Sequence, residues 1–217
     1  MGPFTGESRR RGSVPSILAR ALVCGVFAVA LAAALPACSS SSPAKEVKKE
    51  LGPHAVVIDV PTIKQKELEE CGLAVLLFLL HWSGTPLDDE ARARFSLDRV
   101  EKEAIAPREL RDYLRSRGFR AELVNGQRDG AYPRGLFAVL RTGVPVIVEV
   151  EETGSPRYML ICGYDPEHTL VFFMDPIRGL STKNTDFFEA DWAKADHRMV
   201  VAVPPGVAPA PGATPAR

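Results

Sequence analysis

An apolar run begins at Cys71 and continues to Trp82, interrupted only by His81. Its residues are apolar on every side of a helical projection, which predicts a helix buried at the centre of a domain. A cysteine at the start of such a helix meets unpaired N–H groups and the positive end of the helix dipole, and both favour its thiolate. From the helix alone, a small buried apolar side chain is the simpler interpretation of Cys71.

The remaining pattern predicts helices in the first part of the domain and strands in the second. The strands of the second part are apolar on both faces, so we expect a sheet that is covered on both sides. The predicted class is α+β, with helices first and an antiparallel sheet after them. The expected helices cover residues 70–82 (the central helix), 87–94, 99–104, 107–117, 136–141 and 186–192. The expected strands cover residues 55–60, 119–124, 144–149, 158–164, 170–174 and 199–203.

A turn is predicted over Tyr164–Thr169, where Asp165 and Pro166 favour a hairpin. Pairing Tyr164 with Thr169 would place Arg157 opposite Pro176 and one step from Asp175. Strict alternation would then turn Asp175 to the other face, although a bulge could return it.

The same counting places Cys162 on the face opposite to Arg157, because five residues separate them. This argues against a disulfide between Cys71 and Cys162, although an oxidising compartment would permit one.

The first 37 residues have the features of a signal peptide. A basic lead from Arg9 to Arg20 precedes an apolar, alanine-rich run from Ala21 to Leu35, which is shorter than the roughly 20 residues of a spanning helix. Leu35-Pro36-Ala37-Cys38 resembles a bacterial lipobox, and the resemblance implies that Cys38 is lipidated and becomes the mature N-terminus. Ser39 then implies transfer to the outer membrane. Ordinary secretion with cleavage nearby is the alternative.

Composition divides the rest of the chain into three parts. Residues 38–53 form the lipidated cysteine and a flexible tether, residues 54–203 form one domain, and residues 204–217 form a disordered Pro/Ala tail. Loss of residues 1–37 removes four arginines and one glutamate from 27 basic and 27 acidic residues, so the mature chain is slightly acidic. Nucleic acid is therefore not an expected partner. No metal-ligand spacing or phosphate-binding loop occurs, so no cofactor or metal is expected.

Three motifs carry a resemblance to a known family. Gln65 precedes Cys71-Gly72-Leu73-Ala74 by six positions, and the later segments are Arg157–Tyr164 and Met174–Gly179. Together they resemble the bacteriocin-processing cysteine peptidases, the double-glycine leader peptidases of the papain-like superfamily. The resemblance implies a papain-like fold, with N-terminal helices and a central buried helix packed on an antiparallel sheet. It also implies that Gln65 donates to the oxyanion, that Cys71 attacks, and that Asp175 orients the catalytic histidine. Gln65 could instead cap the central helix.

The family's histidine falls on Arg157 in this chain. Arginine stays protonated, so it cannot take the proton of the thiol or return one to the leaving amine. His54, His81, His168 and His197 are all expected to lie away from the site. Asp175 is interpreted as the ion-pair partner of Arg157, with a turn residue before Pro176 as the alternative.

We therefore expect an envelope lipoprotein whose peptidase-like domain is degenerate and binds a peptide or protein without cutting it. It would be anchored by lipid on the periplasmic side of the outer membrane. One alternative is an active cysteine peptidase that uses Cys71 with Gln65. Another is a reactive-thiol protein in which Arg157 keeps Cys71 anionic. The pattern does not predict an oligomeric state.

Overall fold

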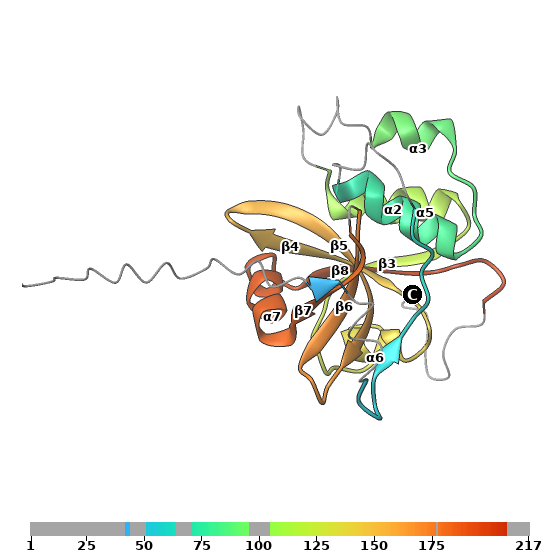
Figure 1. Cartoon of the computed structure of the whole chain (residues 1–217). Coiled ribbons are helices and arrows are strands. Elements are labelled where there is room, and N and C mark those ends of the chain that lie inside the picture. Colours follow the sequence, from blue (N-terminus) through green and yellow to red (C-terminus); the bar gives the residue numbers. More distant parts are fainter. Residues whose placement is uncertain (1–41, 44–50, 64–70, 96–104, 177, 208–217) are drawn as a thin grey trace, which may run out of the picture. The chain divides into compact units, whose positions relative to one another are not determined.

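The structure is a computed structural model that describes residues 42–43, 51–63, 71–95, 105–176 and 178–207. All of these belong to one unit, residues 39–217. The signal peptide, Cys38, Gln65 and residues 208–217 of the predicted tail lie outside the described residues, as does the side chain of Cys71. Predictions about them stay predictions. Figure 1 shows the arrangement of the described helices and strands.

An antiparallel sheet forms the body of the domain (Figure 1). Its strands follow the order β1-β7-β6-β5-β4-β8-β3, and the short β2 pairs with the far end of β5. The predicted α+β class is thus confirmed. The strands are β1 (Ser42–Pro43), β2 (Val56–Val57), β3 (Arg120–Asn125), β4 (Val146–Glu152), β5 (Ser155–Asp165), β6 (Leu170–Asp175), β7 (Gly179–Asn184) and β8 (Arg198–Val203).

Helices pack on the sheet, and two of them begin at residues that favour a helix start. α2 packs on β5, α5 packs on β3 and β8, and α7 packs mainly on β4. Pro107 opens α5, where the Glu109 carboxylate accepts the N–H of Ala106, and the Asn184 side chain caps α7. The described helices are α2 (Cys71–Trp82), α3 (Asp89–Arg94), α5 (Pro107–Ser116), α6 (Leu136–Leu140) and α7 (Thr185–Lys194).

The central helix is buried as predicted. Leu76, Phe78 and Leu79 in α2 are fully buried, and they join a core that continues through the apolar strands. The predicted helix over residues 99–104 lies outside the described residues. Among the described residues, no helix has the length and apolar character needed to span a bilayer.

The predicted register of the β5–β6 hairpin is wrong. Tyr164 pairs with Val171 rather than Thr169, because the four-residue loop contains residues 166–169 and not residues 165–168. The buried Asp165 carboxylate accepts the N–H groups of Glu167 and His168, and Thr169 turns the chain with a φ of 53°. Farther along, a bulge lies between Ile161 and Gly163.

These differences change two conclusions that rested on the register. Leu160 pairs with Met174, so Arg157 does not lie opposite Pro176. Cys162 is the inserted residue of the bulge and is fully buried, so counting alternate faces along a regular strand does not apply to it. A disulfide between Cys71 and Cys162 stays an untested alternative.

Candidate functional site

The start of α2 is joined to β5 through Ile105. A Cβ placed on Gly72 would lie 2.5 Å from the Cδ1 atom of Ile105, so this glycine lets the isoleucine pack directly against the first turn of the helix. The carbonyl oxygen of Ile105 accepts a hydrogen bond of 2.6 Å from the hydroxyl of Tyr158. Tyr158 therefore points to the face of β5 that lies toward the beginning of α2.

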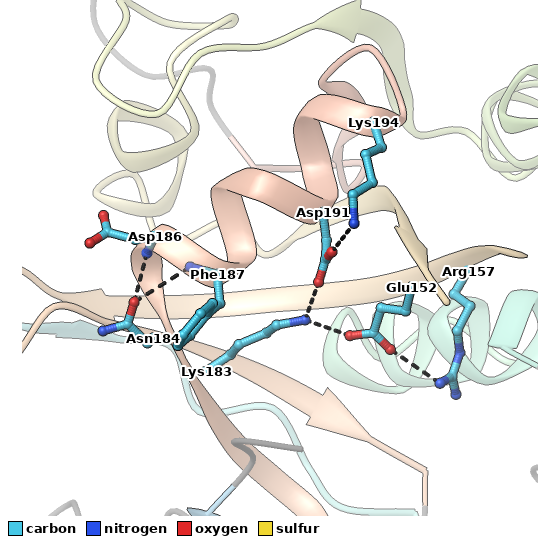
Figure 2. Close-up of polar contacts among 8 residues, drawn as sticks. All are labelled: Glu152, Arg157, Lys183, Asn184, Asp186, Phe187, Asp191 and Lys194. Carbon is cyan, nitrogen blue, oxygen red and sulfur yellow. Dashed lines mark hydrogen bonds and ion pairs between the residues drawn. The ribbon is translucent and has the colours of Figure 1, made fainter. Parts of the chain in front are cut away.

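Arg157 points to the opposite face, because neighbouring side chains in a strand alternate. Its Nη1 atom lies 3.2 Å from Oε2 of Glu152, across the β4–β5 hairpin, and 54% of its side chain is exposed. Oε1 of Glu152 accepts a hydrogen bond of 2.5 Å from Lys183 in β7. Lys183 also donates to Asp191 of α7 at 2.7 Å, and Asp191 accepts a second bond from Lys194 (Figure 2). We call these five residues the hairpin–α7 network.

Asp175 ends β6 and has a role in the following turn. Its Oδ1 atom accepts the N–H of Arg178 at 2.7 Å. Ile161 pairs with Phe173, so these two side chains share a face of the sheet. Arg157 lies four residues from Ile161, and Asp175 lies two residues from Phe173. Because side chains alternate along a strand, Arg157 and Asp175 lie on that same face. Strict alternation would separate them, and the bulge in β5 returns Asp175 to the face of Arg157, which is the alternative that the sequence left open. The ion pair between Arg157 and Asp175 stays a prediction.

Each of the chain's four histidines lies in the described residues, and three of them contact carboxylates. Nδ1 of His54 lies 2.5 Å from Glu167, and Nδ1 of His168 lies 2.8 Å from Asp165. Nε2 of His197 lies 2.8 Å from Oε1 of Glu189 in α7. The fourth, His81, is exposed in the last turn of α2, ten residues and about 15 Å from Cys71 along the helix.

A second polar cluster shares the face of Tyr158 and was missed in the sequence. Glu149 pairs with Tyr158 across the strands, and its Oε2 atom lies 3.2 Å from Nε of Arg198. Burial raises the pKa of the Glu149 carboxyl, although Arg198 opposes this effect. Burial also raises the pKa of Tyr158, so its hydroxyl stays protonated and acts as a donor. The signal was a glutamate between two valines in β4, at position 149.

The family motifs thus identified the candidate site residues but did not predict which residues contact them. Arg157 contacts Glu152 at the end of β4, and Glu152 in turn contacts Lys183 of β7. The family motifs mark neither of these two residues. Cys71 starts α2 as predicted, while its side chain and Gln65 are outside the described residues. The described residues contain no group of three side chains suited to hold a metal ion.

The hairpin–α7 network gives a testable difference between two lysines. Lys183 has 12% of its side chain exposed and contacts two carboxylates, whereas Lys194 is 53% exposed and contacts only Asp191 within the network. We expect Lys183→Met to lower the free energy of unfolding by about 1–2 kcal/mol at pH 7, and Lys194→Met by less than about 0.5 kcal/mol. Urea denaturation of both variants measures this, and equal effects would contradict it.

Acid should reduce the effect of Lys183→Met. Burial raises the pKa of Asp191, but the hydrogen bonds from Lys183 and Lys194 prevail and leave that pKa below its usual value. A lowered carboxyl pKa stabilises the fold above the unfolded value of about 4, and the stabilisation is lost as pH falls through the lowered value. The difference between wild type and Lys183→Met should therefore shrink below about pH 4, and an unchanged difference at pH 2.5 would contradict this.

Comparison with solved structures identifies the fold. A double-glycine motif protease from an AMS/PCAT transporter, solved with its leader peptide, matches with a TM-score of 0.52 and 17% identity over 69% of this chain and 94% of that chain. The peptidase domain of Streptococcus ComA matches with a TM-score of 0.50 and 15% identity, over 68% and 98% of the two chains. A C39-like peptidase from Bacillus anthracis gives 0.50 and 16%, over 69% and 97%.

No family model and no curated protein sequence matches the chain. The three structural matches have identities below 20%, so they bear on the fold and not on activity. They agree with the resemblance seen in the motifs around Cys71, Arg157 and Asp175. The described domain therefore has the papain-like fold of the double-glycine and C39-like peptidases.

Proposed function

We propose that this protein is an envelope lipoprotein whose peptidase-like domain binds peptides without hydrolysing them. The observation that carries the proposal is the environment of Arg157. The motif resemblance assigns Arg157 to the position of the family's histidine. In the structure its guanidinium contacts Glu152 on the face opposite to Tyr158. Three of the chain's four histidines contact carboxylates (His54, His168 and His197), and His81 lies in the last turn of α2, at the end of the helix away from Cys71.

Hydrolysis by a cysteine requires two proton transfers. A base must take the proton of the thiol, and an acid must protonate the amine that leaves. Arginine can do neither at neutral pH, because its guanidinium keeps its proton. Tyr158 is next to Arg157 in the strand, but burial raises the pKa of its hydroxyl. That hydroxyl donates a hydrogen bond to the carbonyl oxygen of Ile105. Loss of one triad member leaves only residual catalysis from binding and oxyanion contacts.

Peptide binding is supported by the fold. The protease from the AMS/PCAT transporter was solved in complex with a leader peptide. A domain that keeps such a fold while losing its base can keep the binding surface, because peptide contacts and proton transfer use different groups. The ligand we propose is an extended peptide of the double-glycine leader type.

Anchoring is proposed from the sequence. Leu35-Pro36-Ala37-Cys38 would direct acylation of Cys38, and Ser39 would direct the protein to the periplasmic side of the outer membrane. Two or more acyl chains are needed for stable anchoring, which a lipidated N-terminal cysteine provides.

A labelled leader peptide tests binding and cleavage together. We expect the anisotropy of a fluorescent peptide with a double-glycine junction to rise to saturation as protein is added. Mass spectrometry should then recover the peptide intact after prolonged incubation, because the base is missing. Cys71→Ala is the matched control and should bind the peptide equally well.

Three other outcomes would contradict the proposal. Cleavage that Cys71→Ala abolishes would establish the active peptidase instead. A covalent peptide adduct on Cys71 would favour the reactive-thiol alternative. Absence of binding by a folded protein would remove the peptide-binding function.

A further inference from the structure

The first described strand shows in which direction the chain leaves the domain. β1 pairs antiparallel with β7 at one end of the strand order, with Ser42 opposite Thr182 and Pro43 opposite Ser181. Moving from Pro43 back to Ser42 therefore means moving along β7 toward Asn184. At Asn184, β7 ends and α7 begins. The chain therefore enters β1 at Ser42 from the side on which α7 begins.

The distance to the proposed anchor is short. Cys38 precedes Ser42 by four positions, and a fully extended chain covers at most about 14 Å over that length. An acylated Cys38 has its acyl chains in the bilayer. The end of β7 and the first turn of α7 must then lie close to the membrane surface, because the strand pairing leaves little chain to separate them.

An exposed aromatic side chain lies at this end of the domain. Phe187, in the first turn of α7, is 62% exposed, more than any other large apolar residue in the described part of the chain. Figure 2 shows it beside Asn184, which accepts the N–H groups of Asp186 and Phe187. Its neighbour Phe188 is fully buried under the sheet, so the helix is held in place while Phe187 faces outward. Aromatic side chains favour the boundary between lipid head groups and acyl chains.

We propose that the surface around Phe187 at the start of α7 contacts the lipid bilayer that holds Cys38. The proposal rests on the lipoprotein anchor proposed above. It adds an orientation, with the β7 end of the sheet toward the membrane. The exposed Asp186 beside Phe187 would be repelled by anionic head groups, so the contact is apolar and does not require acidic lipids.

Tryptophan quenching measures this contact directly. The acylated protein carrying Phe187→Trp would be purified from membranes and placed in phosphatidylethanolamine/phosphatidylglycerol vesicles with or without brominated acyl chains. We expect the added fluorescence, after subtraction of wild-type protein with Trp82 and Trp192, to fall at least two-fold in brominated vesicles. The matched control is Arg108→Trp, at an exposed position in α5, which packs on β3 and β8. It should show no added quenching.

The outcomes separate the anchor from the orientation. An intact mass without acyl groups on Cys38 would overturn the lipoprotein proposal, and the orientation with it. Acylated protein in which Phe187→Trp is not quenched, or is quenched no more than Arg108→Trp, would overturn the orientation alone.

A longer link tests the role of the four-residue spacing. Twelve added Gly/Ser residues between Ser39 and Ser42 would give a flexible linker that reaches about 20 Å or more. We expect the quenching of Phe187→Trp to fall toward that of the Arg108→Trp control. Full quenching in the lengthened protein would contradict the inference that the short link holds this surface on the bilayer.

Discussion

Replacing Trp192 by alanine is expected to lower the free energy of unfolding by about 3–5 kcal/mol. Trp192 is fully buried between α7 and the sheet, where it stacks on Phe188 at 5.5 Å between ring centroids. Its indole Nε1 donates to the carbonyl oxygen of Arg198 at 3.1 Å, and the edge of its ring contacts His197. The substitution removes this packing and the hydrogen bond together, leaving a cavity beneath α7.

The same helix supplies a matched control. Phe187→Ala removes an aromatic ring five residues away, but this ring is mostly exposed and should contribute less than about 0.5 kcal/mol to unfolding in solution. Denaturant unfolding of both variants at pH 7 measures the difference. Since domains of this size are stabilised by about 5–15 kcal/mol, Trp192→Ala should remain foldable but clearly weakened. Similar losses for the two variants would show that α7 does not pack as described.

Gly163→Ala is expected to destabilise the domain by about 3 kcal/mol. A Cβ atom at this position would lie 2.2 Å from the carbonyl oxygen of Val56 and 3.0 Å from the Cα atom of Val57. Both are backbone atoms of β2, which pairs with β5 there, so neither can move without breaking the pairing. The close approach of two backbones therefore requires glycine.

Gly154→Ala provides the comparison for a different requirement. Gly154, in the β4–β5 turn, has a φ of 82° and open space around it, so alanine there incurs only the backbone strain of about 1 kcal/mol. Thermal unfolding followed by circular dichroism distinguishes the two variants. A smaller loss for Gly163→Ala than for Gly154→Ala would indicate that β2 does not lie against β5.

The sequence predicted most helices and strands because they are long or apolar. α2 and the strands β4, β6 and β8 were visible as apolar runs, and Pro107 marked the beginning of α5. β7 was missed because its sequence, Gly-Leu-Ser-Thr-Lys-Asn, has little apolar pattern. It forms because it pairs along its whole length with β6, which is a tertiary contact that a local pattern does not contain.

The sequence predicted which residues form the candidate site, but not the directions in which their side chains point. Family motifs identified Cys71, Arg157 and Asp175, but side-chain direction in a sheet depends on register. The position of the loop after Asp165 and the bulge at Cys162 each shifted the pairing between β5 and β6 away from the predicted one. Glu152, which contacts Arg157 in the structure, is five residues away in sequence, yet no motif distinguished it from its neighbour Glu151.

The alternation along the β4–β5 hairpin limits which changes in chain length the protein can accept. Arg157 and Tyr158 face opposite sides because residues 146–161 pair without interruption, from Glu152 and Ser155 at the turn to Val146 and Ile161. Deleting one residue of β5 between Tyr158 and Ile161 would invert the side chains on the turn side of the deletion, and would place the charge of Arg157 on the face where Tyr158 now packs against the core. Deleting two residues would preserve the faces. Insertions and deletions tolerated in this arm should therefore come in even numbers.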